Sequence, residues 1–191
     1  MRTESAIDRA DVCVLVLDAV EGLTVEDKRI ATAIDEEGKG CIIVFNKWDL
    51  IHGFRVEHCL QQLKMEANFL STCPILFISA KTGKRVDQIF PTVDAVYAAM
   101  HQRISTGTLN RVIEELMRRV HPPMIQGKRL RIYYTTQVEV DPPSLVAFVN
   151  YPNLMTESYR KYLLNGLRKH TPFLGSPVRF SLRGKKASIR S

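Results

Sequence analysis

Three short apolar runs, separated by amphipathic helical patterns, constrain the first half of this 191-residue chain more than any other feature. The runs are residues 11–18, 41–45 and 74–78, each typical of a strand buried on both faces. Helical periodicity follows each run, over residues 24–38, 60–70 and 89–100. The alternation predicts an α/β fold with a parallel sheet and right-handed crossovers, in which ligands bind beyond the carboxyl ends of the strands.

Polar motifs stand directly after two of these predicted strands. The sequence Asn-Lys-Trp-Asp occupies residues 46–49, and Ser-Ala-Lys occupies residues 79–81. A carboxylate can accept two parallel hydrogen bonds from the adjacent N–H donors of guanine, a pair that adenine does not offer. Either motif alone is equally typical of a turn with a helix cap. Together, in this chain order, they predict two loops that frame one guanine base.

With these motifs the first half resembles the GTPase superfamily, whose guanine-reading sequences are N-K-x-D and S-A-K. The resemblance implies that the Asp49 carboxylate accepts hydrogen bonds from guanine N1 and N2. It implies that Asn46 reaches the N7 side of the base, while Lys47 packs along the base and sugar. For the second motif it implies a loop whose central backbone N–H donates to guanine O6, formed by Ser79, Ala80 and Lys81.

The phosphate-handling sequences of such GTPases are missing. No G-x-x-x-x-G-K-[S/T] string occurs, and no D-x-x-G switch element precedes the first apolar run. Residues 2–10 resemble the helix that follows the second switch, so we expect Met1 to match an internal position of the family pattern and the sheet to be truncated. We therefore expect weak GTP or GDP binding, Mg²⁺ only in a complete family protein, and no GTP hydrolysis by this chain alone. The first strand would have an open edge able to pair with another chain.

The net charge of +7 is divided unequally along the chain. Residues 1–104 carry 12 basic and 15 acidic side chains, whereas residues 105–191 carry 15 and 5. The asymmetry indicates two functional units, and the second faces either a polyanion or only solvent. Its periodicity predicts a small α+β domain at 105–184, in the order α-β-β-α-β, and a basic tail at 185–191. The expected elements are residues 108–120, 130–140, 145–149, 156–170 and 178–182.

This second half resembles the KH-like domain that closes the tandem GTPases of the Der (EngA) family. The matching segments are residues 109–111, 122–123, 133–138, 142–143, 148–150 and 158–160. Residues 1–104 would then be the latter part of the second G domain of that family, which is associated with assembly of the large ribosomal subunit. The implied partners are guanine nucleotide, ribosomal RNA of the large subunit and the first G domain of the parent protein. The predicted RNA-facing side chains are Lys128, Arg129, Arg131, Arg160, Lys161, Arg168, Lys169, Arg179 and Arg183.

RNA-binding KH domains clamp the nucleic-acid backbone with a G-x-x-G loop, and this sequence has none. We therefore expect electrostatic RNA contacts, or a docking surface for the G domains. The alternative interpretation is a non-enzymatic basic RNA- or protein-interaction module whose vestigial nucleotide-binding half only supports it. The longest uncharged apolar run, residues 12–17, is far shorter than the ~20 residues of a membrane span, and the N-terminus has no signal core. A cytoplasmic protein with reduced cysteines and no membrane partner is expected.

Overall fold

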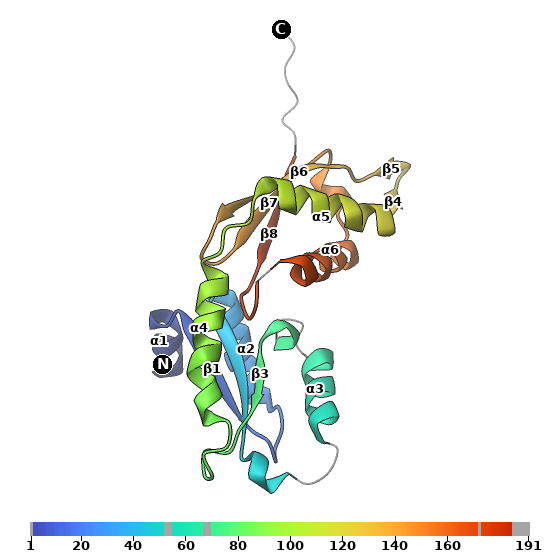
Figure 1. Cartoon of the computed structure of the whole chain (residues 1–191). Helices are drawn as coiled ribbons and strands as arrows, with labels where there is room; N and C mark the ends of the chain where they lie inside the picture. Colours follow the sequence, from blue (N-terminus) through green and yellow to red (C-terminus); the bar gives the residue numbers. More distant parts are fainter. Residues whose placement is uncertain (1, 52–54, 67–69, 172, 185–191) are drawn as a thin grey trace. The chain divides into compact units, whose positions relative to one another are not determined.

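The computed structural model describes residues 2–51, 55–66, 70–171 and 173–184 (Figure 1). The chain divides into two compact units. The first unit comprises Met1–His101 and Phe173–Pro177, and the second comprises Gln102–Pro172 and Val178–Ser191. The predicted basic tail, residues 185–191, lies outside the described residues. Among the described residues, every helix is too short or too polar to span a bilayer.

A three-stranded parallel sheet in the order β1-β2-β3 forms the centre of the first unit. Its strands are β1 (Val12–Asp18), β2 (Gly40–Asn46) and β3 (Ile75–Phe77). The central strand β2 is buried from Gly40 to Phe45, because apolar side chains cover it on both faces. The predicted parallel sheet is confirmed, and β1 is an edge strand on which Val16 is 55% exposed.

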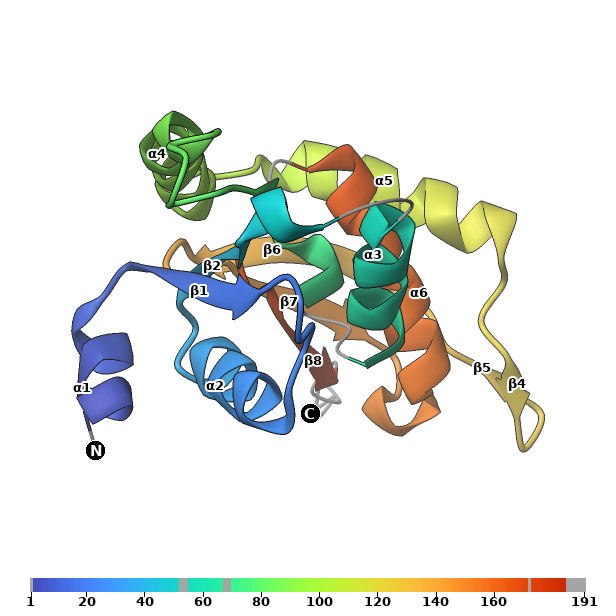
Figure 2. The ribbon, with the colours of Figure 1, turned by 90° about the horizontal axis from the view of Figure 1, so that it is seen from below.

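Helices cover both faces of this sheet. They are α1 (Arg2–Arg9), α2 (Val25–Glu36), α3 (Arg55–Glu66) and α4 (Ile89–Met100). One apolar cluster joins α1, α2 and α3 to the sheet through Ile7, Ile34 and Leu63, and a second cluster on the other face joins α4 through Val96 and Met100. Figure 2 accordingly shows α2 and α4 on opposite sides of the strands. Helix α2 begins at the capping box that residues 24–27 predicted.

The segment Phe173–Pro177 packs within the first unit, although it lies inside residues 105–184, the range predicted for the second domain. The Cys41 N–H donates to the Gly175 carbonyl at 2.8 Å, and the Gly175 N–H donates to the Thr72 carbonyl at 3.2 Å. Gly175 has a φ of 61°, and a Cβ there would lie 2.7 Å from the Cys41 carbonyl oxygen. Glycine is therefore needed for both the backbone conformation and the close approach.

The second unit contains a three-stranded sheet in the order β6-β7-β8, with β6 and β7 antiparallel and β7 and β8 parallel. The predicted α-β-β-α-β order is present, with an unpredicted hairpin of two very short strands after the first helix. Gln126 and Gly127, both with positive φ, form its turn. The elements are α5 (Thr106–Arg119), β4 (Met124–Ile125), β5 (Lys128–Arg129), β6 (Ile132–Glu139), β7 (Ser144–Val149), α6 (Glu157–His170) and β8 (Arg179–Gly184).

The Asn110 side chain of helix α5 covers part of the outer edge of β6. The Asn110 amide donates to the Thr135 carbonyl at 3.2 Å, and the Thr135 N–H donates to Asn110 Oδ1 at 2.7 Å. These bonds satisfy a backbone donor and acceptor that an edge strand would otherwise leave open. Helix α6 packs on α5 at Gly166, where a Cβ would lie 2.4 Å from Leu116 Cδ2.

Candidate functional site

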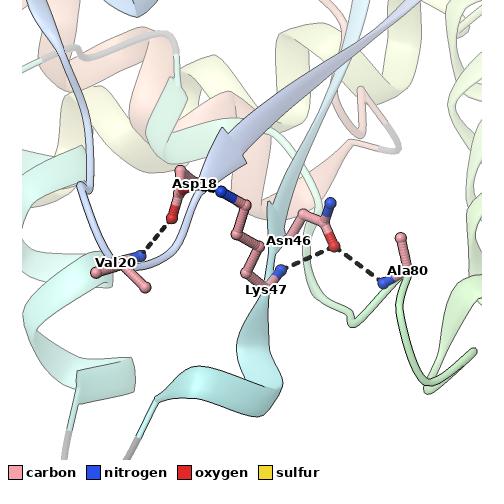
Figure 3. A network of polar contacts seen from close by, with 5 residues as sticks. All are labelled: Asp18, Val20, Asn46, Lys47 and Ala80. Carbon is pink, nitrogen blue, oxygen red and sulfur yellow. Dashed lines mark hydrogen bonds and ion pairs between the residues drawn. The ribbon is translucent and has the colours of Figure 1, made fainter.

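The two motif-bearing loops meet beyond the carboxyl ends of β2 and β3 (Figure 3). Asn46 is the last residue of β2, and its Oδ1 accepts hydrogen bonds from the Lys47 N–H at 2.8 Å and the Ala80 N–H at 3.0 Å. A single amide oxygen thus ties the first motif to the second. The family resemblance implies that the Ala80 N–H donates to guanine O6. In this structure the same N–H donates to Asn46 Oδ1.

The Asp49 carboxylate is oriented by the second loop. Ser79 is fully buried, and its Oγ donates to Asp49 Oδ1 at 2.6 Å while accepting from the Thr82 N–H at 3.2 Å. This hydrogen bond from Ser79, supported by the charge of Lys81, lowers the pKa of the Asp49 carboxyl. The side chain is therefore ionised at neutral pH and able to accept hydrogen bonds.

Lys47 is held by Asp18, which lies outside the two predicted motifs. Its backbone lies in the left-handed region, with φ at 63°, and its Nζ lies 2.5 Å from Asp18 Oδ2. The other oxygen of Asp18 accepts from the Val20 N–H at 2.8 Å, so the carboxylate is itself fixed (Figure 3). Asp18 pairs in register with Asn46 at the end of β1. Its position at the carboxyl end of the first strand was the signal, since the other site residues lie at or just after the ends of the neighbouring strands.

The ion pair predicts a pH-dependent contribution to stability. The hydrogen bond from Lys47 lowers the pKa of Asp18, so the pair stabilises the fold above the usual aspartate pKa of about 4. That contribution is lost as the pH falls through the lowered folded-state pKa. Asp18→Asn should therefore have a lower urea midpoint than the unchanged chain at neutral pH, and the difference should vanish in acid. A difference independent of pH would contradict this assignment.

The nine predicted RNA-facing residues come from several elements of the second unit. Two lie on β5, one lies between β5 and β6, four lie on α6 and two lie on β8. Arg160 also has a structural role, because its guanidinium donates to the Phe180 carbonyl at 2.7 Å. Lys128 Nζ lies 5.0 Å from the centre of the Tyr151 ring. Within the part of the chain that the structure describes, no three His, Cys, Asp or Glu side chains are grouped to hold a metal.

Comparison with known proteins identifies both halves of the chain. Residues 1–102 match the family model of the elongation factor Tu GTP binding domain. Residues 103–183 match the model described as KH-domain-like of EngA bacterial GTPase enzymes, C-terminal. Among solved structures, the chain matches the GTPase Era. Era from Aquifex aeolicus is 20% identical with a TM-score of 0.43, and the alignment covers 95% of this chain and 67% of that one.

Curated relatives extend the match over nearly the whole chain. GTPase Der of Protochlamydia amoebophila is 57% identical over 185 residues, which are 97% of this chain and 38% of that protein. GTPase Der of Moorella thermoacetica is 44% identical over 185 residues, which are 96% of this chain and 42% of that protein. The chain thus spans about 40% of the length of these relatives. It belongs to the GTPase Der (EngA) family, with the GTP-binding domain in its first half and the KH-like domain in its second.

Proposed function

We propose that the first unit binds guanine nucleotides and that the basic second unit contacts RNA during assembly of the large ribosomal subunit, in the cytoplasm. The observation that most supports the first part is the pair of cross-loop contacts, Asn46 Oδ1 to the Ala80 N–H and Ser79 Oγ to Asp49. They bring the two predicted base-reading loops together and orient an ionised carboxylate. This carboxylate would accept from the N1 and N2 donors of guanine.

The remaining site residues surround the same base. Lys47 would pack its stem along the base and sugar, with its ammonium held by Asp18. Ala80 could donate to guanine O6 only by sharing its N–H with Asn46 or by a small shift of the loop. Since the sequence contains no phosphate-binding loop, base contacts would have to provide most of the affinity. We therefore propose weak GTP or GDP binding and no hydrolysis by this chain alone, with Mg²⁺ bound in the complete family protein.

Calorimetric titration with GDP and ADP tests the nucleotide proposal. The two ligands carry the same phosphates and differ in the base, so a preference for GDP measures base recognition alone. We expect GDP binding without detectable ADP binding. Absence of GDP binding at millimolar nucleotide would favour the other candidate function, a non-enzymatic interaction module with a vestigial nucleotide-binding half.

The RNA proposal is supported by the charge of the second half. Residues 105–191 carry 15 basic and 5 acidic side chains, and exposed Lys or Arg residues occur on β5, α6 and β8. Lysine and arginine that neutralise phosphates release counterions, and this release makes RNA affinity salt-dependent. The family resemblance suggests ribosomal RNA of the large subunit, and the first G domain of the parent protein, as partners.

Reversing three of these charges should weaken RNA binding. In the variant Arg129→Glu, Arg131→Glu and Lys169→Glu, we expect lower affinity and a shallower dependence of log K on log salt. The slope should fall by about 0.7–0.9 for each phosphate that the protein no longer neutralises. The measurement is fluorescence anisotropy with a labelled large-subunit RNA fragment over a range of salt concentrations.

The matched control changes the same amount of charge in the first unit, through Arg9→Glu, Arg29→Glu and Lys84→Glu. These three side chains are exposed. An equal loss of affinity in both variants would show that only net charge matters. Salt-insensitive binding by the unchanged chain would contradict the phosphate contacts themselves.

A further inference from the structure

One row of side chains crosses all three strands of the sheet in the second unit. Tyr134 on β6 pairs in register with Phe148 on β7, which pairs in register with Arg183 on β8. Side chains of directly paired residues project from the same face of a sheet, so these three lie side by side. The Tyr134 and Phe148 rings are stacked, with their centres 4.3 Å apart and their planes at 14°. We call these three residues the aromatic row.

The aromatic row lies on the face of the sheet opposite to the helices. Alternate residues of β6 point in opposite directions, and Thr135 and Gln137 are buried on the side that packs against α5. Tyr134 is 44% exposed, Phe148 is partly exposed and Arg183 is exposed. Ring surface and a guanidinium are thus accessible together on this face.

The charge of this face favours an anionic ligand. Arg179 is also exposed, and it lies on the same face as Arg183 because the two are four residues apart on one strand. The paired residues in the row between them, Thr136, Val146 and Ser181, carry no charge. Glu139, at the end of β6, accepts a hydrogen bond from Ser144, the residue paired with Arg179. The row of Arg179 thus also contains a carboxylate, whereas Arg183 lies in the row of the two stacked rings. Arg183 is therefore the cation beside these rings.

We infer that the aromatic row is a binding site for single-stranded RNA. One base stacks on the paired rings of Tyr134 and Phe148, and a phosphate pairs with Arg183. Exposed aromatic rings beside arginine suit this ligand because every base has a π-face and every nucleotide carries a phosphate. The inference rests on the proposal that the second unit binds RNA. It goes further because it names the face and requires contacts to bases, whereas charge alone predicts only phosphate contacts.

The test compares a short oligouridylate with an oligonucleotide of equal length and charge that lacks its bases. Anisotropy should show that the unchanged chain prefers the oligouridylate by about tenfold, the effect of one stacked base. Tyr134→Leu keeps an apolar side chain but removes the ring, so it should abolish the preference and leave the salt dependence unchanged. Arg183→Gln should retain the preference and lower the salt slope by about 0.7.

Two further variants keep the test decisive. Phe148→Leu removes the other ring and should also abolish the preference. It takes the place of Tyr134→Leu in the test if circular dichroism shows that Tyr134→Leu does not fold. Tyr97→Leu is the matched control, because Tyr97 is a 46% exposed tyrosine of the first unit, and it should leave the preference intact.

The outcomes distinguish failure of the aromatic row as a base-stacking site from failure of RNA binding by the second unit. Equal binding of the two oligonucleotides by the unchanged chain, or a preference that survives loss of either ring, would overturn the inference while RNA binding through phosphates remained. No binding of either oligonucleotide at low salt would overturn the RNA part of the proposed function, and the inference with it.

Discussion

Asp49→Ala should abolish the preference of the chain for GDP over ADP. In the proposed complex the carboxylate accepts two hydrogen bonds from guanine, and hydrogen bonds to a charged group contribute about 1.5–3 kcal/mol each. Their loss should weaken GDP binding by about 100-fold or more, which in calorimetry would appear as no detectable binding. Ser79 Oγ still accepts from the Thr82 N–H after the substitution, so we expect the loop and the fold to remain intact.

Asp49→Asn is the informative companion variant. It keeps the size of the side chain and replaces one carboxylate oxygen by an N–H donor. Xanthine carries a carbonyl where guanine carries its 2-amino group, so this variant should bind xanthosine diphosphate in preference to GDP. GDP affinity that is unchanged in both variants would place nucleotide binding elsewhere in the chain and contradict the proposed site.

Gly175→Ala should have the largest effect on stability, lowering the free energy of unfolding of the first unit by about 2–5 kcal/mol. Part of this is the strain of a non-glycine residue at a φ of 61°. The larger part is steric, because the new Cβ would lie 2.7 Å from the Cys41 carbonyl oxygen and 2.9 Å from Pro74 Cδ. Cys41 lies in the central strand of the sheet and cannot move aside without disturbing its pairing.

Urea unfolding followed by tryptophan fluorescence provides the measurement. Trp48 is the single tryptophan and packs 4.4 Å from the Phe77 ring, so its emission reports on the first unit. Gly83→Ala is the matched control, since Gly83 has a φ of 76° and no atom within 4 Å of an added Cβ. It should cost only the backbone strain of about 1–2 kcal/mol. Equal destabilisation by the two variants would show that the clash at Gly175 is unimportant.

Much of the first unit was predictable because its signals are local. The apolar runs that became β1, β2 and β3 are short and bounded, and the start of α2 is encoded in four consecutive residues. The hairpin β4–β5 was missed because its strands have only two residues each, too few for any alternation to show. The residues of the two guanine motifs could be predicted from the sequence because each motif is contiguous and is therefore also a local signal.

Local sequence patterns were enough to predict the parallel sheet and the position of two polar loops at one of its edges, because parallel strands direct their carboxyl ends to the same side. The contacts between groups distant in the sequence became known from the folded structure. Asp18 reaches Lys47, Gly175 joins the first unit, and Tyr134 lies in one row with Phe148 and Arg183. These contacts depend on the register of the strands and on segments that lie tens of residues apart in the sequence coming together in the fold. Hydrophobic periodicity, which extends over a single helix or strand, carries no information about them.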